Sequence, residues 1–288
     1  MEAARIGIIG GSGLYSLDLL ENVRSLALRT PFGDPSGEYR LGDHAGRRVA
    51  FLARHGDGHR LLPGEINYRA NLYGFRMLGV ETILGVSAVG SLREEIAPGD
   101  LVLPDQFLDR TRRQPSTFFG DGIAVHVAFA EPVCARARGS LADAAAAEGA
   151  TVHDRGTYLC IEGPQFSTRA ESLLYRSWGA AVIGMTNLPE AKLAREAEIC
   201  YASLALVTDY DTWHDREESV TAGSVVELLR RNVNRARGVL FRTLSDLSPE
   251  PGCPCRHALR DSILTDPSRI DPAVRERLHL LIGRYLET

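Results

Sequence analysis

The chain has 288 residues, of which 44% are hydrophobic, so it can bury a full core as one large domain or as two ordinary ones. Its formal net charge of −4, without a run of Lys and Arg, argues against nucleic acid as a partner. Apolar stretches are shorter than the roughly 20 residues of a membrane span, and a strand pattern follows Met1 too closely for a signal peptide. A cytoplasmic protein without a membrane partner is therefore expected.

Short apolar runs alternate with helical patterns along the chain. Helices are expected after residue 186 and over 66–79, 134–150, 168–179 and 224–244. Strands are expected over 5–11, 47–56, 81–91, 100–109, 156–164, 180–185 and 200–211. This alternation favours an α/β fold with a central twisted mixed β-sheet flanked by helices.

The composition changes after Leu247, where the proline-rich stretch "SPEPGCPC" begins. A last helix is predicted over 271–287, with Asp271 as its cap and Pro272 at its first position. We therefore expect one main domain, residues 1–247, and a C-terminal connector and helix, residues 248–288, packed on it as an appendage.

Five cysteines are scattered over the chain, at positions 134, 160, 200, 253 and 255, and most are expected to be small buried hydrophobes. Cys253, Cys255 and His257 lie close together in the tail. Zinc normally takes four ligands and this group offers three, so no metal site is predicted. A structural or redox role is the preferred interpretation.

A glycine-rich loop follows the first predicted strand, in "RIGIIGGSGLY". It lacks the G-x-G-x-x-G spacing of dinucleotide folds and the Lys-Ser or Lys-Thr pair of a P-loop. Its backbone N–H groups and the Ser12 hydroxyl are still sufficient for one small anion. A plain turn after an edge strand explains the loop, taken alone, equally well.

Two further strand ends carry groups that could bind an anion. Arg54 and His55 end one strand and offer a planar fork of donors and a titratable ring. Ser87 and Ala88 lie in a stretch of small residues on another. Ligands of α/β sheets usually bind at such edges, whereas surface charge is the plain alternative.

The last two predicted strands end on polar groups as well. Met185 and Thr186 precede a helix that contains Glu190, although a methionine more often fills the core. Asp209 and Asp211, two positions apart, point to one side of an extended backbone. They could be a turn or helix cap, but carboxylates beside buried apolar runs are costly without a purpose.

These stretches also resemble a known family. The motifs "GIIGGSGLY", "INYRANLYG", "SAVGSLREEIAPGDLVLPDQFLDRT", "IEGPQFSTRAES", "GMTNLPEAKLAREAEICYAS" and "VTDYDTW" follow one another between about Ile6 and Trp213. They are similar to those of the 5′-methylthioadenosine phosphorylases, in the trimeric purine nucleoside phosphorylase superfamily, while the tail from Ser248 matches only loosely. The resemblance implies phosphate-dependent cleavage of S-methyl-5′-thioadenosine to adenine and 5-methylthioribose 1-phosphate, by a homotrimer or a dimer of trimers, without metal or organic cofactor.

The resemblance further implies roles for single residues. Phe166 would pack against the purine, and Met185 would lie under the ribose. Asp209 would face the purine N7 and 6-amino group, with Asp211 nearby, and His126 would reach the 5′-substituent pocket of a neighbouring subunit. Inorganic phosphate would lie among Ser12, Arg54, His55, Ser87, Ala88 and Thr186.

The aspartate at position 209 bears on the choice of substrate. A carboxylate accepts a hydrogen bond from a 6-amino group but meets a 6-oxo group lone pair to lone pair, which favours adenine nucleosides. An apolar 5′ pocket discriminates by only about 1–3 kcal/mol, so adenosine could be a slower substrate. The alternatives are a methylthioinosine or broader purine nucleoside phosphorylase, a hydrolase, and a non-catalytic nucleotide-binding module.

Overall fold

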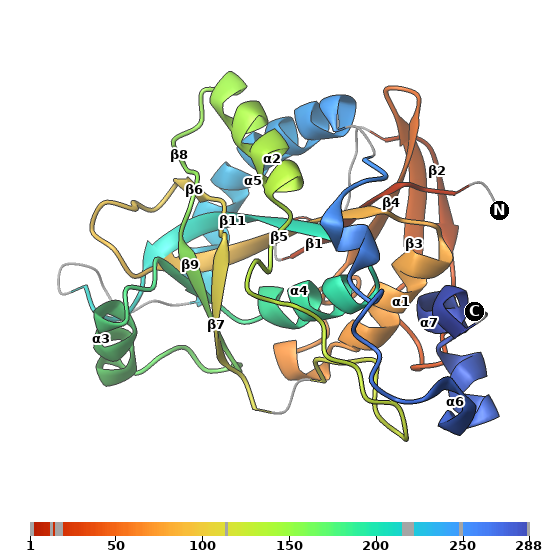
Figure 1. Cartoon of the computed structure of the whole chain (residues 1–288). Helices are drawn as coiled ribbons and strands as arrows, with labels where there is room; N and C mark the ends of the chain where they lie inside the picture. The colour runs from red at the N-terminus through yellow and green to blue at the C-terminus, as the bar shows by residue number, and fades with distance from the viewer. Residues whose placement is uncertain are drawn as a thin grey trace.

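The structure, a computed structural model, describes residues 3–11, 14, 20–112, 115–214, 222–247 and 250–286. The described strands form one mixed 11-stranded sheet, in which β2, β3, β4, β1, β5, β10, β9 and β7 are neighbours in that order (Figure 1). Three further pairings lie outside this row, because β11 pairs with both β5 and β6, and β6 pairs with β8. The fold is α/β, with a central mixed sheet, as predicted.

The strands are β1 (Ile6–Gly10), β2 (Glu21–Leu26), β3 (Tyr39–His44), β4 (Arg47–Ala53), β5 (Thr82–Ser91), β6 (Leu101–Val102), β7 (Gln106–Arg110), β8 (Val152–His153), β9 (Thr157–Ile161), β10 (Val182–Gly184) and β11 (Cys200–Tyr210). The helices are α1 (Tyr68–Met77), α2 (Ala135–Ala147), α3 (Arg169–Ser177), α4 (Asn187–Glu196), α5 (Ala222–Asp246), α6 (Pro272–Arg277) and α7 (His279–Leu286). Every predicted strand and helix is present.

Three details differ from the prediction. The run over 100–109 forms two strands, β6 and β7, because Pro104 stands between them and cannot donate to a ladder. The predicted last helix is two helices, α6 and α7, with a break at Leu278. The sequence analysis missed β2, β3 and β8; β2 is exposed along nearly its whole length and shows no alternation of apolar residues.

Helices cover both faces of the sheet (Figure 1). Successive residues of β1 enter two different cores: Ile8 packs in the cluster that includes α2 and α5, and Ile9 packs in the cluster that includes α1 and α4. All five residues of β1 are buried, as in a strand covered on both sides. Among the described residues, no helix is both long and apolar enough to cross a bilayer.

The C-terminal helices lie against α1. Val274, Leu278 and Leu281 belong to the same core cluster as Phe75, and the Tyr73 hydroxyl donates to the Arg277 carbonyl at 3.1 Å. The predicted apolar face of this segment is therefore buried on the chain's own body. The division of the chain after residue 247 stays a prediction.

In the centre of the sheet, β5 and β11 are longer than β1 and β4 and extend beyond their ends. β1 is parallel to β4 and β5, with Ile9 opposite Gly85, and β5 runs six residues past that pair to Ser91. β11 follows β5 in parallel over this whole length. The second halves of β5 and β11 therefore border the loops that leave β1 and β4.

One glycine sets the distance between β1 and α1. A Cβ atom at Gly7 would lie 2.8 Å from two ring carbons of Phe75. We expect Gly7→Ala to lower the free energy of unfolding in urea by about 1–3 kcal/mol, because the buried ring cannot move away freely. The control Gly37→Ala adds a methyl group with no neighbour within 4 Å, and an equal loss in both variants would contradict the packing argument.

Candidate functional site

Arg54 lies directly after β4, and its side chain is only 1% exposed. Its Nε and Nη2 donate to the two carboxylate oxygens of Glu190 at 2.5 and 3.0 Å, and Nη1 donates to the Val86 carbonyl at 2.8 Å. These contacts engage three of the five guanidinium N–H groups and fix the plane of the fork. The guanidinium is thus held rigidly where β4 and β5 meet the first turn of α4.

Glu190 is buried as deeply as Arg54 and has a second donor. The Tyr201 hydroxyl, from β11, donates to its Oε2 atom at 2.8 Å. A Cβ atom at Gly85 would lie 2.6 Å from this hydroxyl, so glycine leaves room for the tyrosine. Burial lowers the pKa of the Arg54 guanidinium, but the charge of Glu190 raises it, and this pKa lies above its ordinary value. The Arg54 guanidinium therefore stays charged inside the protein.

The loop after β1 approaches the Arg54 fork very closely. A Cβ atom at Gly11 would lie 2.6 Å from Arg54 Nη1 and from the Val86 carbonyl oxygen, and 3.4 Å from Ser87 Cα. Only glycine permits this approach of backbone to guanidinium. The predicted Ser12 lies outside the described residues.

Several buried polar groups beside this fork have no hydrogen-bond partner among the described residues. They include Ser87 Oγ, in β5, and Asn187 Nδ2, at the first position of α4. Thr186 is the N-cap residue of α4, is 5% exposed, and makes no capping hydrogen bond with its side chain. Because the first N–H groups of a helix lack internal partners and carry partial positive charge, this end of α4 favours an anion.

His55 follows Arg54 and is held in one tautomer. Its Nδ1 lies 2.8 Å from the Leu61 carbonyl oxygen, so Nδ1 carries the proton and Nε2 is an acceptor in the neutral ring. The ring stacks on His59 with centroids 4.2 Å apart. Burial and then the Arg54 charge lower the pKa of His55 to about 4.

The two predicted aspartates lie together at the far end of β11. A bulge between Val207 and Asp209 shifts the register, and a Cβ atom at Gly90 would lie 3.0 Å from Asp209 Oδ1 and 3.4 Å from Asp211 Cβ. The Thr208 hydroxyl donates to Asp209 Oδ2 at 2.7 Å. Asp211 is 5% exposed, and burial raises the pKa of its carboxyl above the ordinary value. Glycine at position 90 leaves room for the Asp209 carboxylate and the Asp211 Cβ atom.

The other predicted residues differ in their surroundings. Met185 is half-buried, and its sulfur lies 2.5 Å from where a Cβ atom at Gly163 would be. Phe166 is 47% exposed on the segment before α3, so it is available to cover a ligand. Ala88 is half-buried beside Ser87. His126 is exposed, and its backbone N–H donates to the Ser262 carbonyl in the C-terminal segment.

The structure therefore brings Arg54, Ser87 and Thr186 together through Gly11 and the helix that carries Glu190. Glu190 was not predicted to have a role in the site, and Tyr201 and Asn187 were not predicted at all. An acidic residue four positions after Thr186, inside the apolar first turn of a helix, is the signal that could have identified the partner of Arg54. Tyr201 gives no such signal because it lies in a continuous apolar strand.

One edge of the sheet therefore carries a rigid buried guanidinium, a helix N-terminus and a pair of aspartates, an arrangement that suits an oxyanion beside a polar organic group. The model of the phosphorylase superfamily matches residues 5–245. The chain belongs to this superfamily.

Two curated relatives of this chain carry the same name. The chain is 55% identical to S-methyl-5′-thioadenosine phosphorylase of Geobacter sulfurreducens, over 98% of this chain and 99% of that one. It is 56% identical to the protein of the same name from Thermosynechococcus vestitus, with the same coverage.

Two solved structures of methylthioadenosine phosphorylases are also similar to this chain. A methylthioadenosine phosphorylase from an antarctic soil metagenomic library superposes with a TM-score of 0.93 at 47% identity, over 98% of this chain and 99% of that one. Methylthioadenosine phosphorylase from Schistosoma mansoni, in complex with adenine, superposes with a TM-score of 0.84 at 34% identity, over 97% and 98% of the two chains.

The buried ion pair makes the first prediction from this site. Glu190→Gln leaves the Arg54 charge buried without its counter-charge, so we expect the free energy of unfolding to fall by about 3–5 kcal/mol. The matched control is Glu95→Gln, which removes the partner of Arg93 in an exposed pair and should cost at most about 1 kcal/mol. Equal losses in urea unfolding would mean that the buried pair does not support the fold.

His55 makes a prediction about pH. Its pKa of about 4 in the folded protein lies below the ordinary 6.5, so the unfolded chain binds more protons between these values. The contribution of His55 is thus fully present above pH 6.5 and is lost as the pH falls toward 4. Relative to His55→Gln, the wild type should lose up to about 3 kcal/mol of stability across this window in phosphate-free buffer.

The control for this measurement is His279→Gln, at an exposed histidine of α7. It should retain the pH dependence of the wild type. A His55→Gln protein whose stability falls with pH as steeply as that of the wild type would contradict the depressed pKa.

Proposed function

We propose that this protein cleaves the N-glycosidic bond of S-methyl-5′-thioadenosine with inorganic phosphate, giving adenine and 5-methylthioribose 1-phosphate. The observation that carries the proposal is the rigid Arg54 fork, which lies beside Ser87 around Gly11 and is held by Glu190 at the N-terminus of α4. Such a set of fixed donors suits a tetrahedral oxyanion. The 55% identical relative of the same printed name supports the choice of nucleoside.

Phosphate held by these fixed donors, called here the Arg54 cage, is a reactant. Arg54, Ser87 and Thr186 would hold it below the ribose, with Ser12 as a further ligand implied by the resemblance. His55 Nε2 is an acceptor and so matches the one proton of monohydrogen phosphate. A phosphate oxygen then forms the bond to the ribose C1′ as the bond from C1′ to the purine nitrogen breaks, and the fixed cage removes most of the entropic cost of this encounter.

The aspartate pair would serve the leaving group. Positive charge develops on the ribose near phosphate while negative charge develops on adenine, and Asp209 is proposed to donate a proton at N7. Asp211, whose buried carboxyl has a raised pKa, has its Cβ atom beside the same space around Gly90. Phe166 and Met185 are proposed to enclose the base and the sugar. Neither step requires a metal or an organic cofactor.

The assembly and the location of the protein are also proposals. We propose a homotrimer, in which His126 reaches a neighbouring 5′ pocket. Its support is the exposed apolar surface of Leu173, Leu174 and Trp178 on and after α3, close in sequence to Phe166, which a neighbouring subunit would cover. Association of two trimers and a cytoplasmic location stay predictions from the sequence.

The role of Asp209 can be tested on substrate choice. We expect the wild type to release base from methylthioadenosine faster than from methylthioinosine, adenosine or inosine. Asp209→Asn should lower kcat for methylthioadenosine by about 10²–10⁴-fold, because the amide has no proton to transfer at N7. The same change should raise the relative rate on methylthioinosine, because the amide can donate to a 6-oxo group.

The matched control is Asp143→Asn, on the exposed surface of α2, which should leave all four rates unchanged. A wild type that prefers inosine would contradict the proposed substrate. An Asp209→Asn variant with unchanged rates would contradict only the proton-donating role.

A further inference from the structure

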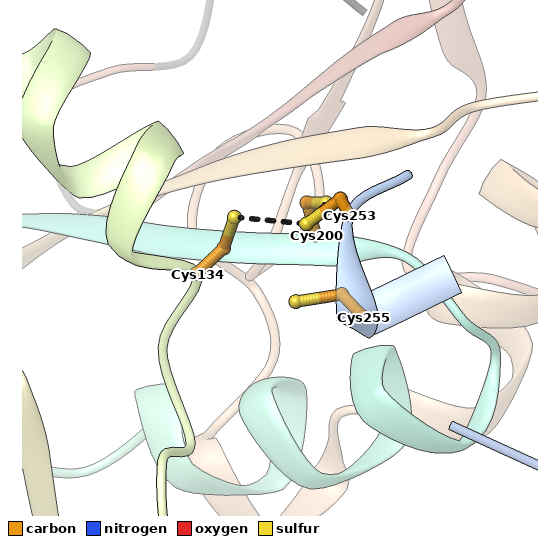
Figure 2. A group of neighbouring side chains, drawn as sticks. All are labelled: Cys134, Cys200, Cys253 and Cys255. Carbon is orange, nitrogen blue, oxygen red and sulfur yellow. Dashed lines mark hydrogen bonds between the residues drawn. The ribbon is translucent and has the colours of Figure 1, made fainter. Parts of the chain in front are cut away.

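Four of the five cysteines meet inside the protein, although they come from three distant parts of the chain (Figure 2). Cys134 directly precedes α2, Cys200 begins β11, and Cys253 and Cys255 flank Pro254 at the end of the proline-rich stretch. All four side chains are buried. The sequence analysis considered Cys253 and Cys255 with His257, but the structure leaves His257 exposed and supplies two other thiols instead.

The distances between the sulfur atoms distinguish a metal site from disulfides. All four sulfur atoms lie within 4.8 Å of one another, with Cys134 and Cys253 3.8 Å apart and Cys200 and Cys253 3.4 Å apart. A disulfide needs about 2.0 Å. Thiolates at about 2.3 Å from one zinc ion, at the corners of a tetrahedron, are about 3.8 Å apart. The cluster therefore has the spacing of a four-thiolate site.

The surroundings of the cluster suit the negative charge that four thiolates carry. Arg136, in the first turn of α2, interacts with the Cys200 sulfur, and the Ala137 N–H at the start of the same helix hydrogen-bonds Cys134. A guanidinium and a helix N-terminus both stabilise thiolate. The cluster also lies in the core between the sheet and α2 and α5, where water cannot compete as a ligand.

We propose that Cys134, Cys200, Cys253 and Cys255 bind one zinc ion with full tetrahedral coordination. Binding would replace the four thiol protons, which pass to solvent, by one divalent ion. Four thiolates leave no open position, so the role is structural. The ion would fasten the C-terminal segment to α2 and β11. In that segment, Ile263 forms an isolated β-bridge with Val125, the residue before His126.

The test is the metal content of the full chain, purified under reducing conditions without chelator. We expect one zinc per chain by inductively coupled plasma mass spectrometry. Cys255→Ser should lose the zinc, whereas the control Cys160→Ser, at the buried cysteine of β9 outside the cluster, should keep it. Zinc removal by chelator should lower the Tm of the wild type and leave that of Cys255→Ser unchanged.

Cobalt provides a readout that does not depend on any variant. Refolding the wild type with Co²⁺ should give the sulfur-to-cobalt charge-transfer bands and the intense visible bands of tetrahedral thiolate coordination. Wild-type protein without zinc, with cobalt spectra that lack these bands, would overturn the proposal even if Cys255→Ser does not fold. Disulfides between the four cysteines, seen as a lower intact mass without reductant and by peptide mapping, would overturn it as well.

Discussion

The candidate site depends on one buried ion pair. Arg54 and Glu190 are each only 1% exposed, and their two parallel hydrogen bonds leave neither charge unpaired. Removing both charges from water is costly, and only close pairing with further donors offsets that cost. Tyr201 and the Val86 carbonyl are the further partners here. The arrangement holds a guanidinium still at the end of β4, beside Gly11.

The fold supplies the surroundings of that pair through the lengths of its strands. β1 and β4 end where β5 and β11 continue, so Gly11, Arg54 and Ser87 gather at one level of the sheet. The bulge before Asp209 then places the carboxylates one step further along the same two long strands. The proposed oxyanion site and the proposed site for the purine therefore lie along the same two strands.

Local signals in the sequence were sufficient for most of the fold. The Asp271 cap is present as predicted. The capping box of Thr168 and Glu171 begins one predicted helix and the left-handed Gly79 follows the end of another, and each of these features depends on contacts within one turn. Strand β2 was missed because its register is set by β3 and not by its own apolar pattern.

The site was only partly predictable for the same physical reason. Arg54 and Thr186 stand at strand ends, where polar residues after apolar runs are visible in the sequence. Glu190, 136 positions from Arg54, meets it only because α4 folds back on the sheet. The cysteine cluster is a stronger example, since Cys134 and Cys253 are 119 positions apart and each resembles an ordinary core residue when read alone.

The Arg54 cage is proposed to hold phosphate as a reactant. The most direct measurement follows methylthioadenosine by ³¹P nuclear magnetic resonance and adenine release, with phosphate present and with phosphate removed. We predict that adenine appears only with phosphate, in equal amounts with a new sugar 1-phosphate resonance. Adenine release at the same rate without phosphate, with free methylthioribose as the other product, would contradict this account.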